Sequence, residues 1–404
     1  MYILICNAGS TSLKYKLFLM PGEQAVAEGK MDRVGSRNAS IFSYKSTKTS
    51  FIREGMDIPS YREGIRLFLD ALTDAETGVI AGVADVDAIG FKTVIGKGYT
   101  GVHDIDDACM QGLEDYMNVA PVHNSAYLEA IRAFKALLPD MPMVGVFEPF
   151  FHRTIPEEAY VYGIPYEWAQ AHGIRRYGYH GASHRYVSET AKKYGNPKYV
   201  ISCHLGGSGS ICAIRGGVSQ NNSFGFSLQS GVQHSTRTGD LDPFIPIYLL
   251  KSGLTLEEVW DGLVKRGGLL GISGVSGDLR DIQEAANKGD KRARLAIDVY
   301  CHGIRSYIGS YYAQLGGLDL LAFTGGIGEN SAEVRRLVCE PLAHMGIKLD
   351  EPKNAACRGD EAVISAPDSR VTVVVIPANE ELVLAREVFA HMAKRRGEQK
   401  NLVM

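Results

Sequence analysis

Several features that mark specialised classes of protein are missing from this sequence. It has two tryptophans in 404 residues, no C-x-x-C pair among its seven cysteines, and no apolar run near the ~20 residues that a membrane-spanning helix needs. An odd number of cysteines without such pairs argues against a disulfide framework or a zinc site, so we expect reduced thiols. The N-terminus lacks the basic segment and the longer apolar stretch of a signal peptide. We therefore expect a cytoplasmic protein without a membrane anchor.

An excess of charge of one sign is also missing. The formal net charge is −3, and no basic stripe interleaved with aromatic residues runs along the chain, so we expect no nucleic-acid partner. The hydrophobic fraction of 45% and the charged fraction of 22% are ordinary for globular proteins and exclude a disordered or collagen-like chain. Because single cores rarely grow beyond ~250–300 residues, a chain of 404 residues predicts two domains.

Two hairpins rich in glycine and serine repeat one pattern. Residues 2–18 are typical of a buried strand, a polar turn and an alternating strand, and residues 199–214 repeat this order with a cysteine at the same place. Self-similarity over this distance indicates a duplication rather than an array of short repeats. We place the first domain at residues 1–150 plus 382–404 and the second at residues 151–381, facing each other across a cleft.

Predicted strands alternate with predicted helices, which indicates an α/β protein. Helices are expected at residues 61–72, 125–138, 183–193, 256–265 and 292–315.

The remaining predicted strands lead into glycine or proline turns. Residues 318–323 form a strand that enters a glycine turn, where a capping box of Asn330 and Glu333 is expected to start a helix. Backbone amides at that helix start would form an anion or nucleotide site. A last strand at residues 371–376 ends at the Pro377–Asn379 junction, a predicted hinge and helix cap, before a terminal helix.

Polar residues at the first hairpin tip could bind phosphate. Neither hairpin carries a P-loop or dinucleotide-binding pattern. Asn7, Ser10, Ser12 and Lys14 nevertheless offer an amide, hydroxyls and an ammonium for phosphate oxygens. A structural turn without a ligand is the alternative for either hairpin alone. Together with the third glycine turn, the two hairpins favour a nucleotide cleft.

A histidine and an arginine lie in loops suited to phosphoryl transfer. His180 precedes a predicted helix start that Ser183 would cap, where the helix dipole would complement a phosphate. The alternative is a buried histidine with protein partners. Arg237 shares a polar loop with Asp240 and Asp242, and would either contact phosphoryl oxygens or pair with these carboxylates. The sequence leaves both alternatives open.

Two glutamates follow apolar strands. Glu148 and Glu380 would therefore lie at strand ends, where open α/β sheets bind ligands. Either carboxylate would orient Mg²⁺, directly or through water.

Motifs in collinear order along nearly the whole chain resemble the acetate kinase family. They are Asn7–Lys14, Tyr177–His184, Cys203–Gly206, Thr236–Arg237, Asp240–Pro243, Phe323–Asn330 and Pro377–Glu381. The resemblance implies a duplicated actin-like (ribonuclease H-like) fold with a central cleft, in which the C-terminal helix completes the first domain. It further implies a homodimeric kinase that uses ATP or ADP with Mg²⁺ and converts a short-chain carboxylate into an acyl phosphate.

The resemblance also implies roles for single residues. Asn7 and Glu380 match the magnesium-site residues of the family, and His180 and Arg237 match its transition-state stabilisers. The residues that match its phosphate contacts are Lys14, His204, Leu205, Gly206, Gly207 and Ser208. The residues that match its adenosine site are Asp278, Leu279, Arg280, Gly326, Ile327, Gly328, Glu329 and Asn330.

This chain departs from the family pattern where the acid would bind. Lys92 stands in place of a carboxylate-binding arginine and lacks its bidentate fork, and Glu148 stands in place of a catalytic aspartate. The apolar pocket for the acid corresponds to Val94, Val122, Tyr179 and Leu228. Tyr179 adds a hydroxyl where the family commonly has Phe, and a buried hydroxyl prefers a hydrogen-bond partner. We therefore expect an acid that is larger or more polar than acetate.

The implied reaction needs cations more than it needs a base. A carboxylate is already ionised at neutral pH, so phosphoryl transfer to it is governed by positioning and charge neutralisation. We assign His180 and Arg237 to the transferred group, Lys14 with Mg²⁺ to the nucleotide phosphates, and Lys92 to the acid. Two alternatives remain: a kinase for a non-carboxylate acceptor with Glu148 as base, and a nucleotide-binding protein with weakened catalysis.

Overall fold

Contacts within the computed structural model divide the chain into two units. Unit 1 comprises residues 1–150 and 379–404, and unit 2 comprises residues 151–378. The structure describes residues 1–9 and 11–402, with the backbone alone for Pro121, Val122 and residues 398–402. The chain returns to unit 1 at Asn379 rather than at the expected residue 382, so Glu380 belongs to unit 1.

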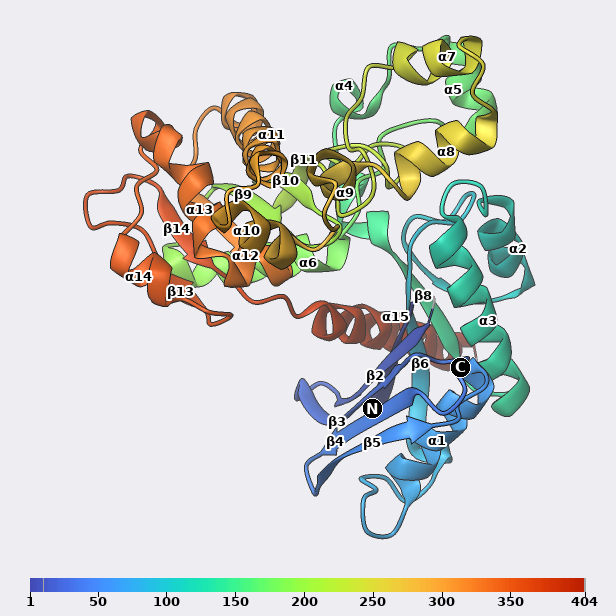
Figure 1. The fold of residues 1–404 in the computed structure, drawn as a ribbon. Helices are drawn as coiled ribbons and strands as arrows, with labels where there is room; N and C mark the ends of the chain where they lie inside the picture. Colours follow the sequence, from blue (N-terminus) through green and yellow to red (C-terminus); the bar gives the residue numbers. More distant parts are fainter. Residues whose placement is uncertain (10, 403–404) are drawn as a thin grey trace. The chain divides into compact units, whose positions relative to one another are not determined.

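Unit 1 is built on one mixed sheet (Figure 1). Its strands are β1 (Tyr2–Gly9), β2 (Ser12–Leu19), β3 (Gln24–Asp32), β4 (Ser40–Ser46), β5 (Ser50–Met56), β6 (Val86–Thr93), β7 (Val102–Asp104) and β8 (Met143–Phe147). Its helices are α1 (Tyr61–Thr73), α2 (Asp107–Asp115), α3 (Pro121–Leu137) and α15 (Glu380–Leu402), with a 3₁₀ turn at Val83–Asp85.

The strand order in unit 1 is β5-β4-β3-β2-β1-β6-β8-β7. Strands β1 to β5 pair antiparallel in sequence order, β1, β6 and β8 run parallel, and β7 is antiparallel to β8. The central β1 has four consecutive buried apolar residues from Ile3 to Cys6, as expected for a strand covered on both faces.

Helices α3 and α15 cover opposite faces of this sheet. The ring of Phe91 on β6 meets Phe134 of α3, with ring centroids 5.6 Å apart. A Cβ atom at the preceding Gly90 would lie 2.6 Å from Cγ2 of Val388 on α15. Because successive strand residues point to opposite faces, Lys92 shares the face of Gly90 and points to the side of α15.

Unit 2 contains the second sheet. Its strands are β9 (Tyr199–His204), β10 (Ser210–Arg215), β11 (Val218–Asn222), β12 (Leu320–Thr324), β13 (Ala362–Val363) and β14 (Thr372–Val375). Its α-helices are α4 (Glu157–Tyr160), α5 (Tyr166–His172), α6 (Gly181–Thr190), α7 (Phe244–Lys251), α8 (Leu256–Val264), α9 (Gly268–Ser273), α10 (Leu279–Asn287), α11 (Lys291–Leu315), α12 (Gly325–Asn330), α13 (Ala332–Cys339) and α14 (Glu351–Ala356). Its 3₁₀ turns are Ala191–Tyr194 and Glu340–Met345, and Glu148–Thr154 forms another at the division of the units.

The second sheet repeats the topology of the first. Its order is β11-β10-β9-β12-β14-β13, with an antiparallel hairpin β9–β10, a third antiparallel strand β11, and parallel β9, β12 and β14. The same arrangement is β3-β2-β1-β6-β8 in unit 1, and each sheet ends in an antiparallel edge strand, β7 or β13. The predicted α/β class and the predicted duplication are therefore confirmed.

Helix α11 supplies much of the core of unit 2. Its buried residues recur at helical spacing and are Ala293, Ala296, Ile297, Tyr300, Cys301, Ile304, Ile308, Tyr311 and Leu315. The Asp290 side chain accepts hydrogen bonds from the first helical amides, and Gly316 ends the helix with a positive φ of 80°. On the other face of the sheet, α6 packs against β9 and β12.

The predicted strands and long helices are present, with boundaries shifted by a few residues. The predicted capping box of Asn330 and Glu333 is wrong. Asn330 ends α12, and Ser331 caps the next helix by accepting a hydrogen bond from the amide of Val334. Glu333 instead accepts hydrogen bonds from Gln283 of α10 and Arg294 of α11. Among the helices of the described residues, none is both long and apolar enough to cross a membrane.

A substitution at Gly90 tests how closely α15 packs against the sheet. Gly90→Val would place carbon atoms inside Val388 and Ile5, since even a Cβ would lie 2.6 and 2.7 Å from their side chains. We expect the free energy of unfolding to fall by ~1–3 kcal/mol. Urea unfolding measures it, with Gly82→Val as the control because no atom lies within 4 Å of a Cβ there. Equal stability of the two variants would contradict this packing.

Candidate functional site

Polar residues gather at the carboxyl ends of the parallel strands of unit 1. The register pairs Cys6 with Phe91 and Thr93 with Phe147, so Asn7, Lys92 and Glu148 follow one another across β1, β6 and β8. Glu380 begins α15, which packs against all three strands (Figure 1). Residues far apart in the sequence are thereby brought to one edge of the sheet.

Lys92 is the centre of this cluster. Its Nζ atom lies 3.0 Å from Oε1 of Glu148 and 2.5 Å from Oε2 of Glu380. The three side chains are 15%, 4% and 13% exposed, so little water screens the two ion pairs. Burial alone would lower the pKa of Lys92, but the two carboxylates outweigh it and raise that pKa well above its ordinary value. The residue predicted to hold the acid is therefore held by protein carboxylates.

The other predicted phosphate contacts of unit 1 lie on β2. Lys14 pairs with Asn7 in the β1–β2 register, and Ser12 pairs with Gly9. The Lys14 side chain is exposed and lines a groove of unit 1 that reaches Glu381 of α15. Ser10 lies outside the described residues.

His180 lies in unit 2 with a strained backbone. It is the N-cap of α6 and has φ of 56°, a left-handed conformation that costs a non-glycine residue ~1–2 kcal/mol. The prediction that Ser183 caps this helix is wrong, because α6 begins at Gly181 and the Ser183 hydroxyl lies 2.7 Å from Nδ1 of His204. Strain of this kind persists only where surrounding contacts enforce it.

A chain of hydrogen bonds enforces the orientation of the His180 ring. Nδ1 of His180 lies 2.9 Å from Oγ of Ser210, which lies 2.8 Å from Nε2 of His184. Nδ1 of His184 in turn lies 2.9 Å from Oγ of Ser202 on β9. The ring of His204 lies over that of His180, with centroids 4.1 Å apart. Both alternatives that the sequence left open for His180 hold in part. This histidine has a protein partner in Ser210, and its ring also lies over His204, another predicted site residue.

Arg237 is held beside the second glycine turn. Its Nη1 donates to the carbonyl of Leu228 at 2.6 Å, and the neighbouring Ser235 amide donates to the carbonyl of Gly207 at 2.9 Å. Burial lowers the pKa of Arg237 to about 10, so the guanidinium is still charged at neutral pH. Asp240 accepts hydrogen bonds from the amide of Gly231 and from a tyrosine hydroxyl of α11 rather than from Arg237.

Phe224 joins these motifs. Its ring stacks on His234 with centroids 5.1 Å apart and meets the edge of His180 at 5.3 Å. His234 also accepts a hydrogen bond from the Gly209 amide at 3.1 Å. The segments around His180, the second glycine turn and Arg237, which the sequence separates, thus lie together in unit 2.

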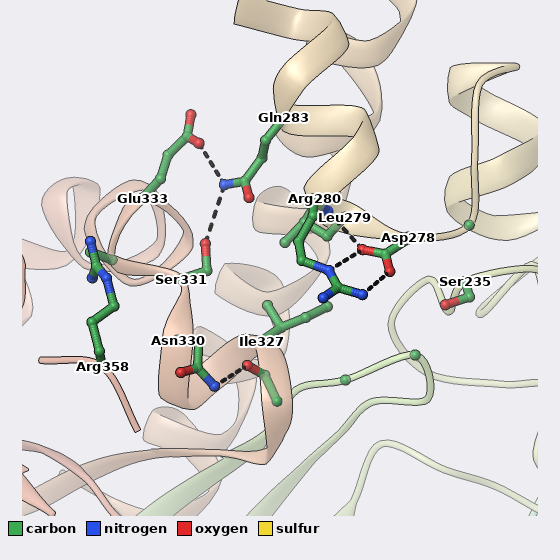
Figure 2. Close-up of a pocket in the computed structure, with 15 residues that line it drawn as sticks. Ser235, Asp278, Leu279, Arg280, Gln283, Ile327, Asn330, Ser331, Glu333 and Arg358 are labelled. Carbon is green, nitrogen blue, oxygen red and sulfur yellow. Dashed lines mark hydrogen bonds and ion pairs between the residues drawn. The ribbon is translucent and has the colours of Figure 1, made fainter. Parts of the chain in front are cut away.

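A pocket of about 740 Å³ adjoins the second glycine turn (Figure 2). Residues predicted as phosphate or adenosine contacts that line it are Gly206, Gly207, Asp278, Leu279, Arg280, Gly326, Ile327 and Asn330. Lining residues that the sequence did not reveal are Ser235, Gly277, Gln283, Ser331, Ala332, Glu333 and Arg358. The predicted contacts His204, Leu205, Ser208, Gly328 and Glu329 are not among the lining residues.

The amides of the third glycine turn are largely taken up by the protein. The Gly325 amide donates to Oε1 of Glu329 at 2.8 Å, and the Ile327 and Gly328 amides donate to the carbonyl of Leu205 at 2.8 and 3.2 Å. The predicted anion or nucleotide site lies at the following helix start, after Asn330, and stays a prediction. Glu329 fixes the glycine turn, and it also accepts from the Ala378 amide at 2.9 Å.

Side chains of α10 and of the loop after α14 lie on opposite sides of the pocket. Figure 2 shows Arg280 folded back onto Asp278, an ion pair of 2.6 Å at the start of α10, with Arg358 on the opposite side. Between them the amide of Gln283 donates to Ser331 and Glu333. Gln283 lies one helical turn after Leu279, so helical periodicity could have found it, whereas no motif surrounds Arg358.

The residues predicted to contact the acid are divided between the units. Val94 is buried in unit 1, Tyr179 and Leu228 are buried in unit 2, and the side chain of Val122 lies outside those described. The Tyr179 hydroxyl donates to the carbonyl of Phe226 at 2.8 Å. This protein partner removes the reason for inferring a polar acid from that hydroxyl.

The sequence as a whole shows which family the chain belongs to. It matches the model of the Acetokinase family over residues 2–386. The chain belongs to the acetokinase family. An acetate kinase of Acetivibrio thermocellus is 43% identical over 395 residues, covering 96% of this chain and 98% of that relative.

Solved structures agree with this assignment to the acetokinase family. The acetate kinase of Porphyromonas gingivalis matches with a TM-score of 0.85 and 37% identity, covering 96% of this chain and 99% of that one. A propionate kinase from Francisella tularensis matches with a TM-score of 0.86 and 34% identity, covering 96% and 98%. The actin-like class expected from the sequence is that of these structures.

Buried histidines of unit 2 make stability depend on pH. Burial lowers the pKa of His152 to about 4 and that of His234 to about 3, from an ordinary 6.5. Below pH 6.5 these two rings therefore bind protons in the unfolded chain but stay neutral in the folded protein. The free energy of unfolding is expected to fall as the pH drops from 6.5 towards 4, by up to ~1.4 kcal/mol per pH unit for each ring.

Urea unfolding between pH 7 and pH 4.5 measures this slope. His234→Gln keeps a polar side chain but removes one titrating ring, so its slope should be smaller than that of the native chain. An identical slope in this variant would contradict the neutral, buried state of His234.

Proposed function

We propose that this protein transfers the terminal phosphoryl group of ATP to the carboxylate of a short-chain acid, giving ADP and an acyl phosphate. Membership of the acetokinase family over residues 2–386 carries the proposal. Relatives named as acetate and propionate kinases support a short acid as the acceptor. The clustering of the segments of His180 and Arg237 beside the glycine-lined pocket in unit 2 supports the proposal.

The nucleotide would occupy the pocket beside the second glycine turn. Its wall combines small residues, which allow close approach of a ligand, with apolar Leu279 and Ile327, which suit a base. Gly206 and Gly207 would face the phosphates, since the Ser235 amide ties this turn to the loop of Arg237. Lys14 of unit 1 is assigned to the same phosphates by the family pattern.

His180 and Arg237 would neutralise the transferred group. The guanidinium of Arg237 stays charged at neutral pH, and the hydrogen-bond chain through Ser210 fixes the ring of His180. One well-placed cation contributes as much as ~10³–10⁵ in rate to phosphoryl transfer. The carboxylate acceptor is ionised beforehand, so no base is required of Glu148.

The residues proposed for Mg²⁺ supply suitable ligands. Asn7, Glu148 and Glu380 present hard oxygen donors at one edge of the sheet, which fit a site completed by water and phosphate oxygens. When bound there, Mg²⁺ would neutralise charge on the nucleotide phosphates. Among the described residues no group of three or more His, Cys, Asp or Glu is placed to hold a metal by itself, so water or phosphate oxygens would complete the site.

Acyl phosphate formation tests the function directly. Purified protein with ATP and Mg²⁺ is offered acetate, propionate, butyrate and glycolate, and acyl phosphate is trapped with hydroxylamine. We expect a hydroxamate from at least one acid, with Lys92 in place of arginine disfavouring acetate. A kinase for a non-carboxylate acceptor would consume ATP with an alcohol and give no hydroxamate, which would contradict the proposal.

Gly326 provides a matched test of the nucleotide pocket. It lines the pocket, and no atom lies within 4 Å of a Cβ built on it, so the side chain of Gly326→Leu would enter the pocket without strain. ATP affinity should fall by ~10-fold or more, since ~1.4 kcal/mol corresponds to tenfold. Gly309→Leu, at an equally open position on α11, should bind ATP normally.

We further propose that unit 2 carries the interface of a homodimer. Helix α7 has no buried residue, and its Phe244 and Tyr248 are 71% and 70% exposed. The neighbouring α8 exposes Leu256 and Trp260. So many large apolar side chains on two adjacent helices exceed what a monomer usually presents to water. Trp168 of α5 is also exposed.

Light scattering tests the dimer. The native chain should have twice the mass of the 44.0-kDa monomer. Phe244→Glu with Tyr248→Glu should give monomers, whereas Ile52→Glu, at an exposed position of unit 1, should leave the mass unchanged. A monomeric native chain, or a dimeric double variant, would contradict this interface.

A further inference from the structure

We infer that Lys92 makes binding of the acid depend on prior binding of a divalent cation. The ammonium that would attract the acid is the same group that Glu148 and Glu380 hold. The inference rests on the proposed function and adds an order of binding to it.

The geometry gives Lys92 two strong protein partners. Its Nζ lies within hydrogen-bonding distance of both carboxylates, at 3.0 and 2.5 Å, and the cluster is nearly closed to water. Glu148 lies directly after β8, Glu380 in the first turn of α15, and Lys92 on β6. The flexible stem of Lys92 allows its ammonium to move away from both carboxylates.

The net charge of this cluster determines whether it repels or attracts an approaching acid. One ammonium and two carboxylates carry a net charge of −1, so an acid carboxylate is repelled although a lysine is present. A divalent cation on Glu148 and Glu380 changes the net charge to +1, and the repulsion becomes an attraction. Because the side chains are little exposed, these interactions are weakly screened by water or salt.

A divalent cation bound to the two carboxylates also replaces Lys92 as the group that neutralises their charge. The ammonium then has a weaker hold on the protein and is available to the acid. Lys92 is therefore a positioning residue with two alternative partners, the protein carboxylates or the substrate carboxylate. A lysine suits this exchange because its charge is compact and its stem flexible, whereas the arginine fork stays with planar partners.

Thermodynamic linkage makes the effect reciprocal. If the cation strengthens acid binding by a given factor, the acid must strengthen cation binding by the same factor. Couplings of this kind are usually ~5–150-fold, and the change of two charge units beside the acid places this one at ~10-fold or more.

Binding of Mn²⁺ in the absence of nucleotide tests the inference without turnover. The free ion is counted by electron paramagnetic resonance during titration of the native protein, with and without saturating propionate or acetate. We expect the acid to tighten Mn²⁺ binding by ~10-fold. Acid binding, followed by the line width of ¹³C-labelled acetate or propionate with Mg²⁺ as the cation, should tighten equally.

Lys92→Met isolates the role of the ammonium. Without it, Mn²⁺ should bind more tightly than in the native chain, and the acid should no longer strengthen that binding. Lys16→Met is the matched control on the same sheet, since its ion pair with Glu28 is longer, at 3.6 Å, and more exposed. This control should keep the native coupling.

Glu148→Gln gives a second, independent variant if Lys92→Met does not fold. The cluster then has no net charge without a cation, so acid binding should depend much less on Mg²⁺ than it does in the native chain. Unchanged dependence in this variant would overturn the inference.

Failure of the inference is distinguishable from failure of the function. Acyl phosphate formation together with Mn²⁺ affinities that ignore the acid would overturn the role of Lys92 and leave the kinase activity standing. Absence of acyl phosphate with every acid, together with tighter Mn²⁺ binding in Lys92→Met, would contradict the proposed function while supporting competition for the carboxylates.

Discussion

The paired carboxylates around Lys92 are the interaction on which unit 1 depends. They fasten three segments that are far apart in the chain: strand β6, the residue after β8, and the first turn of the C-terminal helix. Removing these charges from water costs free energy. The attraction between one ammonium and two carboxylates offsets that cost only while all three groups stay together. Apolar side chains often stabilise a core as well as a buried ion pair does or better. The charges here therefore point to a functional role.

The repeated sheet explains why polar motifs converge. In each unit a hairpin continues into parallel strands whose carboxyl ends share one edge, and loops at that edge carry the polar residues. Unit 1 places oxygen donors and a lysine there, whereas unit 2 places histidines, an arginine and the glycine-lined pocket. One topology thus serves two chemical tasks, because the residues at the strand ends differ.

The sequence predicted the scaffold well for a local reason. Buried strands such as β1 and amphipathic helices such as α11 have periodic apolar patterns, and the two hairpins repeat an order of residue types that survives duplication. The pocket residues Gln283 and Arg358 escaped because the tertiary fold alone brings them to the glycine turns. The capping box failed because Ser331 is the better placed cap. Leu205 and Glu329 hold the amides of the third glycine turn, and no local pattern shows these acceptors.

The state of the Lys92 ammonium tests the central claim most directly. Nuclear magnetic resonance of ¹⁵N-labelled lysine side chains detects an ammonium only when hydrogen bonding slows its exchange with water. The structure predicts a Lys92 signal at near-neutral pH in protein without cation or acid, which is lost in Glu148→Gln and Glu380→Gln. If Lys92 gave only a rapidly exchanging ammonium, like an exposed lysine, its capture by the two carboxylates would be contradicted.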